Sequence, residues 1–308
     1  MRTVPSPTAL FATDIIGVPM DWGASRRGVR FGPDAVRATK LLEELKAMRY
    51  TVRDRGDIEV PGSVALDVHA HEPVRYLEAV RATCSALAEL VERSLRDGAF
   101  PIIIGGDHSM AIGALSGVAR AKGAQGVIWI DAHADVNTPE TTPSGNLHGM
   151  AMAVALGALA DLFPPPAFVS PSVDEQRCVF VGLREVDAGE SRALKSRKVT
   201  CFTMSDIDRL GMNAVMQRAI ELAAGGPRSV HISLDIDSLD PTAAPGTGTP
   251  VPGGLTYREA HLAMELLAES GVAHSLQVAE VNPVLDEHNL TANIAMELIC
   301  SLLGKTII

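Results

Sequence analysis

The feature that most constrains this chain is a short apolar run that ends in ionisable residues. Residues 127–130 read as a buried strand, and Asp-Ala-His-Ala-Asp at 131–135 follows at once. Residues two apart on an extended chain share a face and lie about 6.6 Å apart, so Asp131, His133 and Asp135 can converge on one centre or on two adjacent ones. In open α/β sheets, ligands bind outside the carboxyl ends of the strands. The run therefore predicts half of a two-metal site.

Three more predicted strands also end in ionisable residues. They are 101–104 with His108, 230–234 with Asp235 and Asp237, and 276–279 with Glu280. Neighbouring parallel strands bring their carboxyl ends together, so these groups should meet. Four aspartates at one place cannot all stay ionised without cations, and two divalent ions would balance them. A ligand set rich in carboxylates and free of thiolates favours Mn²⁺ over Zn²⁺.

Each of these residues also has an ordinary structural interpretation. A lone Asp at a strand end is more often a helix N-cap than a ligand, and Asp107 or Ser109 fits that role. A lone histidine is usually structural, and we interpret six of them so: His69, His71, His231, His261, His274 and His288. Six convergent ligands at three strand ends are much harder to explain in this way. The glycine pair Gly105–Gly106 does not match a phosphate-binding loop. It lacks both the G-x-G-x-x-G spacing and a following Lys-Ser/Thr.

Strands and helices alternate along the whole chain. The predicted strands are 14–19, 50–53 (an edge strand), 101–104, 127–130, 179–181, 199–202, 230–234 and 276–279. The predicted helices are 33–48, 73–96, 110–118, 257–268 and 290–303. This alternation indicates an α/β protein with a parallel sheet that is covered on both faces. No break in composition suggests a linker, so we expect residues 1–308 to form a single domain.

Composition excludes several classes of partner. The formal charge of −10 argues against a nucleic-acid surface. The longest apolar run, 150–160, is too short to span a bilayer, and no basic segment precedes an apolar stretch at the N-terminus. The four cysteines form no C-x-x-C pair, which is typical of buried, reduced thiols. We therefore expect a cytoplasmic protein with no nucleic-acid or membrane partner.

Three motifs together resemble the signatures of the ureohydrolases, the family of arginase and agmatinase. They are GGDHS at 105–109, DAHAD at 131–135 and SLDIDSLDP at 233–241. The resemblance covers nearly the whole chain. It implies a three-layer, arginase-type fold with a mostly parallel eight-stranded sheet flanked by helices, and a centre of two Mn²⁺ ions per subunit. By that resemblance one ion takes His108, Asp131, Asp135 and Asp235, and the other takes Asp131, His133, Asp235 and Asp237.

The expected reaction is hydrolysis of a guanidinium group. Two metal ions about 3.5–4 Å apart can share a water and make it hydroxide near neutral pH, and this hydroxide attacks the guanidinium carbon. Asp135 is expected to accept the proton, and Glu280 to pair with the guanidinium. His148 is a candidate proton shuttle because its ordinary pKa lies near working pH. Thr249 is expected to shape the floor of the site, although a role in turn geometry alone is also plausible.

The loop at 137–148 resembles the arginase version of this segment. By that resemblance Asn137, Thr142 and Ser144 contact the substrate α-carboxylate, and Asp187 with Glu190 binds the α-amino group. Without the flanking metal motifs, such a Ser/Thr/Asn/Pro loop would be interpreted as a turn. Glu185 and Ala188 depart from the Asp and Pro of many arginases.

We therefore expect L-arginine and water to give L-ornithine and urea. Similarity of residues 285–292 to bacterial-type arginases suggests a homo-oligomer, a trimer or a hexamer built from trimers. One alternative is another ureohydrolase, such as agmatinase or guanidinobutyrase. An alternative of another class is a non-catalytic regulator that binds arginine, for which loss of a metal ligand would be the usual sign.

Overall fold

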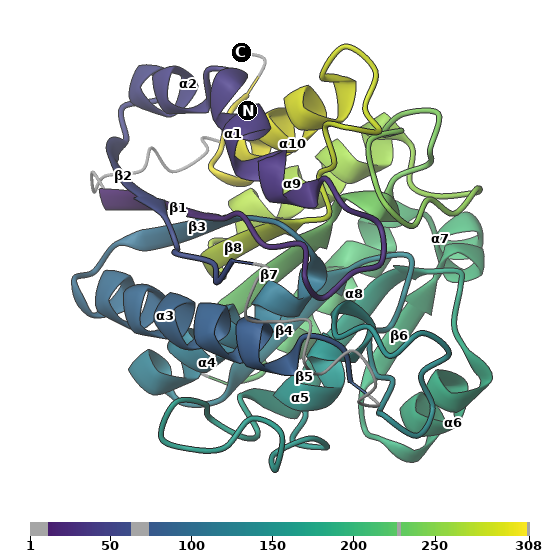
Figure 1. The fold of residues 1–308 in the computed structure, drawn as a ribbon. Coiled ribbons are helices and arrows are strands. Elements are labelled where there is room, and N and C mark those ends of the chain that lie inside the picture. The colour runs from purple at the N-terminus through teal and green to yellow at the C-terminus, as the bar shows by residue number, and fades with distance from the viewer. Residues whose placement is uncertain (1–11, 63–73, 227–228, 307–308) are drawn as a thin grey trace.

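The computed structural model describes residues 12–62, 74–226 and 229–306, and these form a layered α/β fold (Figure 1). Within this part of the chain, eight strands form one sheet in the order β2-β1-β3-β8-β7-β4-β5-β6, and every pairing is parallel. The strands are β1 (Ala12–Val18), β2 (Thr51–Asp57), β3 (Phe100–Gly105), β4 (Gln125–Ile130), β5 (Val173–Leu183), β6 (Thr200–Thr203), β7 (Val230–Asp235) and β8 (Ala273–Ala279).

Helices cover both faces of the sheet. They are α1 (Gly32–Ala38), α2 (Leu41–Ala47), α3 (Leu77–Arg96), α4 (Ala111–Lys122), α5 (Ala151–Ala155), α6 (Ala188–Ser196), α7 (Met204–Leu210), α8 (Met212–Ala223), α9 (Tyr257–Ser270) and α10 (Leu290–Leu302). One hydrophobic cluster joins the sheet to α1, α2, α8, α9 and α10, and a second joins its other face to α3, α4 and α5 (Figure 1). The predicted three-layer fold is confirmed.

The central strands are apolar on both sides because helices cover both of their faces. Ile102, Ile103 and Ile104 of β3 are all fully buried, and they belong to the two clusters alternately. The predicted edge strand is confirmed as β2, at one end of the sheet. Its residues are mostly exposed or half-buried, as expected for an edge strand.

The structure corrects three predicted boundaries. The predicted helix at 33–48 is two helices, because Lys40 adopts a left-handed conformation (φ 67°) that no helix can continue through. The predicted helix at 73–96 begins at Leu77, after Tyr76 in the same conformation, and Pro73 lies outside the described residues. The strand predicted at 179–181 is the end of the longer β5.

Four neighbouring strands occupy the middle of the sheet, in the order β3-β8-β7-β4. These are the four strands that the sequence predicts to end in ionisable residues. Their parallel pairing brings all four carboxyl ends to one edge of the sheet, as open α/β folds require of a binding site. Among the described residues, no helix is both long and apolar enough to cross a bilayer.

Candidate metal centre

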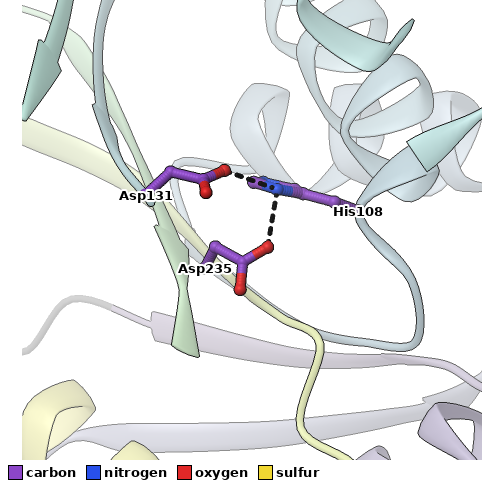
Figure 2. Close-up of side chains that lie close together, drawn as sticks. All are labelled: His108, Asp131 and Asp235. Carbon is purple, nitrogen blue, oxygen red and sulfur yellow. Dashed lines mark ion pairs between the residues drawn. The ribbon is translucent and has the colours of Figure 1, made fainter. Parts of the chain in front are cut away.

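His108 lies at the centre of one group of carboxylates. Its Nδ1 atom is 3.1 Å from an oxygen of Asp131 and 3.0 Å from one of Asp235 (Figure 2). It is also 3.1 Å from an oxygen of Asp135. The His108 side chain is fully buried, and Nδ1 has no hydrogen bond of good geometry. A nitrogen surrounded by three carboxylate oxygens in this way suits a shared cation better than a shared proton.

His133 marks a second group beside the first. Its Nδ1 atom lies 3.1 Å from Asp237 and 3.5 Å from Asp131. Ligand atoms of His108, Asp131 and Asp235 lie within 4.8 Å of one another, as do those of Asp131, His133 and Asp237. Asp131 contributes to both groups, one oxygen to each. The structure thus brings together all six predicted ligands in two adjacent groups.

Electrostatics in this buried cluster favour bound cations. Burial and the charge of Asp131 raise the pKa of Asp135 and of Asp237, and burial with the charges of Asp237 and Asp131 raises that of Asp235. Burial also disfavours the charge of Asp131, but contacts with His108 and His133 overcome this effect and lower its pKa. Carboxylates that repel one another in a dry site are the usual setting for divalent ions with oxygen ligands. The donor set therefore fits two such ions.

Several candidate ligands are held by side chains that the sequence analysis does not predict. The Trp129 indole donates to Asp131 (2.9 Å), and its ring stacks on His108 with centroids 4.0 Å apart. The Ser233 hydroxyl lies 2.8 Å from His108 Nε2. Both residues stand two positions before a ligand on their strands, so they share its face. That period-two spacing is the signal that could have identified them.

Thr249 contacts a candidate metal ligand directly. Its hydroxyl donates to Asp237 at 2.9 Å, so this side chain does more than form a turn.

Asp107 is an N-cap, as one prediction has it, because its carboxylate accepts from the backbone N–H of Ser109 (3.1 Å) and of Gly23 (2.8 Å). A Cβ atom at Gly106 would overlap the Met20 backbone, which explains this glycine without a phosphate ligand.

Glu280 and His148 form a pair next to the metal groups. The Glu280 carboxylate accepts from the His108 backbone N–H (2.9 Å) and lies 3.0 Å from His148 Nδ1. Burial opposes both charges, but the contact raises the pKa of His148 to about 9 and lowers that of Glu280. Glu280 and Asp135 both have positive φ, at 63° and 53°. Such conformations are uncommon outside glycine, and here they occur at two functional candidates.

Four predicted substrate-binding residues contact one another in two pairs, Asn137 with Asp187 and Thr142 with Ser144. The Asn137 amide donates to Asp187 (2.9 Å), while the Thr141 hydroxyl donates to the Asn137 carbonyl (2.9 Å). Thr141 was not predicted, and it orients the Asn137 amide. Thr142 accepts from the backbone N–H of Ser144 (3.3 Å) and of Gly145, so this part of the loop is indeed a turn.

Glu190 is placed differently from Asp187. Its side chain is buried, and its two oxygens accept from the backbone N–H groups of Val136 (3.1 Å) and Asp187 (3.0 Å). Burial raises its pKa to about 7. With Asp187 it forms the capping box that begins α6. Glu190 therefore holds Asp187 and the segment after Asp135 in fixed positions.

One open cavity of about 240 Å³ lies over these groups, large enough for a small molecule. Eleven of the fourteen predicted site residues line it. The others, His108, Asp131 and Glu280, are almost fully buried. The lining residues are His133, Asp135, Asn137, Thr142, Pro143, Ser144, His148, Gly149, Glu185, Asp187, Glu190, Asp235, Asp237 and Thr249.

Two of the histidines predicted to be structural have hydroxyl partners. His231 Nδ1 lies 2.8 Å from the Ser275 hydroxyl, and His261 Nδ1 lies 2.8 Å from that of Ser301. His69 and His71 lie outside the described residues.

Comparison with known proteins identifies the family. The sequence model described as "Arginase family" matches residues 12–304. The chain belongs to the arginase family. The arginase of Bacillus caldovelox is 46% identical over 296 residues, which cover 94% of this chain and 97% of that protein. The arginase of Bacillus subtilis is 44% identical, over 96% of this chain and 98% of its own length.

The arginase fold is equally clear in three dimensions. The solved structure of Bacillus caldovelox arginase superposes with a TM-score of 0.91 and 45% identity, covering 97% of this chain and all of that one. The resemblance inferred from the three motifs is thereby confirmed, together with the fold that it implies.

Proposed function

We propose that this chain is an arginase that hydrolyses L-arginine to L-ornithine and urea. One observation carries the proposal: both metal-ligand groups open into the same cavity as Asn137, Thr142, Ser144 and Asp187. Neutral donors suit the α-carboxylate of arginine, and a carboxylate suits its α-amino group. Near full-length similarity to proteins named arginase supports the same substrate.

We assign two Mn²⁺ ions to the two ligand groups. His108, Asp131, Asp135 and Asp235 would hold one ion, and Asp131, His133, Asp235 and Asp237 the other. When bound, two such ions lower the pKa of a water and so supply a nucleophile near neutral pH. The preference for Mn²⁺ rests on four carboxylates against two imidazoles.

The chain's own side chains orient the substrate and move protons. Asp135 lies at the cavity wall and accepts the proton of the attacking water. Glu280 pairs with the guanidinium, and its contact with His148 Nδ1 (3.0 Å) leaves Nε2 of that ring for proton transfer to the leaving amine. Asn137 and Asp187, joined by a hydrogen bond of 2.9 Å, bind the amino-acid end. Thr142 and Ser144 add donors to the carboxylate.

We also propose a homo-oligomer, a trimer or hexamer, in the cytoplasm, with residues 1–308 as a single domain. Val284, Leu285 and Leu290 are exposed by 64%, 40% and 42%, which supports a covered surface near the arginase-like segment 285–292. Cys84, Cys178, Cys201 and Cys300 are free thiols, which fits a reducing compartment.

The substrate assignment is tested by urea release from arginine and from agmatine by the Mn²⁺-loaded protein. Agmatine lacks the α-carboxylate, so kcat/KM should be far higher for arginine. Asn137→Leu should lower kcat/KM for arginine by about 10–100-fold, which corresponds to the loss of one or two hydrogen bonds to a charged group. The same variant should leave kcat/KM for agmatine nearly unchanged. Faster turnover of agmatine would make the protein an agmatinase. Arginine binding without urea release would indicate a regulator.

A further inference from the structure

The loop that follows β1, residues 19–28, packs against the candidate site from outside. The Gly23 carbonyl accepts from the backbone N–H of His148 (3.1 Å), and the Gly23 N–H donates to Asp107 (2.8 Å). A Cβ atom at Gly23 would overlap the side chains of Asp107 and Ser109, so the contact between these segments is close. None of residues 19–28 is part of the cavity lining.

Buried and stacked groups fix the conformation of this loop. The Asp21 carboxylate is almost fully buried and accepts from the Gly28 N–H (3.2 Å) and the Arg27 guanidinium (3.3 Å). The Trp22 indole donates to the Pro61 carbonyl (3.1 Å), and the Arg27 guanidinium lies 4.4 Å from the centroid of the Trp22 ring. Residues in the middle of the loop are therefore held from both sides.

Ser25, in the middle of this loop, contacts the predicted substrate loop at 137–148. Its hydroxyl accepts from the side-chain amide of Asn146 at 2.8 Å and lies 3.2 Å from the oxygen of the same amide. Ser25 is exposed, whereas Asn146 is buried. The neighbouring Gly145 carbonyl accepts from the Arg75 N–H (3.0 Å). The end of the substrate loop is thus fastened to two segments that lie far from it in the sequence.

Backbone N–H groups in the substrate loop orient two hydroxyls that line the cavity. Thr142 Oγ1 accepts from the N–H of Ser144 (3.3 Å) and of Gly145 (3.0 Å), and Ser144 Oγ accepts from the N–H of Asn146 (3.2 Å). The two hydroxyl oxygens are 3.5 Å apart, too far for a strong bond between them. These bonds use acceptor lone pairs and leave the hydroxyl protons to donate, which suits an anionic group in the cavity.

We propose that Ser25 is a positioning residue for the amino-acid end of the substrate: by holding Asn146, it keeps the hydroxyl protons of Thr142 and Ser144 directed at the α-carboxylate. The inference rests on the proposed function, which assigns that carboxylate to this loop. The bond between Gly23 and His148 uses backbone atoms alone, so it remains when the Ser25 side chain is changed. Ser25 should therefore affect the binding of arginine and leave the chemical step unchanged.

Steady-state kinetics of urea release by the Mn²⁺-loaded protein test this inference. Ser25→Ala removes only an exposed hydroxyl, so the variant should fold. It should raise KM for L-arginine by about 3–10-fold, which corresponds to the loss of one neutral hydrogen bond, and keep kcat within about twofold of the wild type. Ser25→Thr keeps the hydroxyl and should restore the wild-type KM.

Agmatine distinguishes a role at the α-carboxylate from a general disturbance of the cavity. Because agmatine lacks that carboxylate, its inhibition constant against arginine hydrolysis should be the same for Ser25→Ala and the wild type. Ser270→Ala is the matched control. It removes a hydroxyl that donates to the Leu267 carbonyl (2.7 Å) outside the cavity lining, and its KM for arginine should equal that of the wild type.

Three results would overturn the inference. They are an unchanged KM in Ser25→Ala, an equal rise of KM in Ser25→Thr, and an equal loss of affinity for agmatine and for arginine in Ser25→Ala. A wild-type protein that hydrolyses agmatine faster than arginine would instead overturn the proposed function. The two failures are distinguishable, because the second is measured on the wild type alone.

Discussion

Asp131 belongs to both candidate metal-ligand groups. One of its oxygens lies 3.1 Å from His108 Nδ1 and accepts from Trp129 (2.9 Å). The other accepts from the His133 backbone N–H (2.7 Å) and lies 3.5 Å from His133 Nδ1. It is also the aspartate of the cluster whose pKa is lowered while those of Asp135, Asp235 and Asp237 are raised. A carboxylate ionised in this way suits a bridging ligand.

Thr249 should matter for metal binding although it is no ligand. Thr249→Val removes the hydroxyl that donates to Asp237 at 2.9 Å, and we expect about tenfold weaker Mn²⁺ binding with a normal melting temperature. Thr247 in the same loop is the control, because its buried hydroxyl has no hydrogen-bond partner and Thr247→Val should leave affinity unchanged. Equal Mn²⁺ affinities of the two variants, by chelator competition, would contradict the assignment.

The residues predicted from the sequence share one property. His108, Asp131 and Asp235 are polar groups that follow or end apolar strands, and such positions stand out in one sequence. Trp129 and Ser233 lie inside the strands, where a tryptophan or a serine is interpreted as part of the sheet. Their spacing of two residues from a candidate ligand is visible in the sequence, but their contacts with His108 depend on which strand lies alongside, and that information is absent from the order of residues.

The segment after β7 is held in place by one arginine. Arg184, just beyond β5, donates to the carbonyls of Asp237 (2.7 Å), Ser238 (3.1 Å), Leu239 (3.2 Å) and Val251 (2.8 Å). These bonds join the short helix at Ile236–Ser238 to the loop that carries Thr249. The guanidinium therefore maintains the relative positions of Asp237 and Thr249.

Arg184→Lys should loosen this segment. A single ammonium cannot reach four carbonyls, so we expect a loss of about 2–4 kcal/mol in the free energy of unfolding and weaker Mn²⁺ binding. Arg258→Lys, at an exposed ion pair with Glu265, should change stability by less than about 1 kcal/mol. Denaturant titration gives the free energy of unfolding of both variants. Equal values for Arg184→Lys and Arg258→Lys would contradict the role assigned to Arg184.

His231 predicts a specific response to acid. Burial and the nearby His274 lower its pKa from 6.5 to about 3, against an opposing contact with Gln277. The unfolded chain therefore binds a proton that the folded chain rejects between these two values, and stability falls as pH decreases through that window. The loss attributable to His231 between pH 7.5 and pH 5 is about 2 kcal/mol.

Denaturant titrations of the wild type and of His231→Gln, with chelator present, measure the contribution of His231 to the pH dependence of the free energy of unfolding. The variant should lose about 2 kcal/mol less than the wild type between the two pH values, because glutamine does not titrate. His274, whose pKa burial lowers to about 4, contributes equally to both proteins. The same pH dependence in both would show that His231 does not titrate as described.

Helices proved harder to predict than strands. The break at Lys40 carries no glycine or proline, so the apolar spacing on either side of it predicts one helix instead of α1 and α2. Four helices, α5 to α8, were not predicted, and α8 shows why that matters: it packs an apolar face against β4 and β5 and completes one side of the sheet. Strong apolar runs mark buried strands more clearly than amphipathic stripes mark helices.

At the scale of the whole molecule, the order of strands creates the site. β3, β8, β7 and β4 are neighbours in space but far apart along the chain. The strand alternation predicts a parallel sheet, yet many strand orders satisfy it. The sequence therefore predicts that His108, Asp131, Asp235 and Glu280 lie at one edge of the sheet. Only the structure shows that their strands are neighbours, which brings these residues together.

Metal titration of urea release tests the central claim most directly. Protein freed of metal by chelation should release no urea from L-arginine, and activity should rise with added Mn²⁺ until two equivalents are bound per chain. That stoichiometry follows from the proposed centre of two ions, whose candidate ligand groups share Asp131. Full activity in the presence of chelator, or saturation at a single equivalent, would contradict the account.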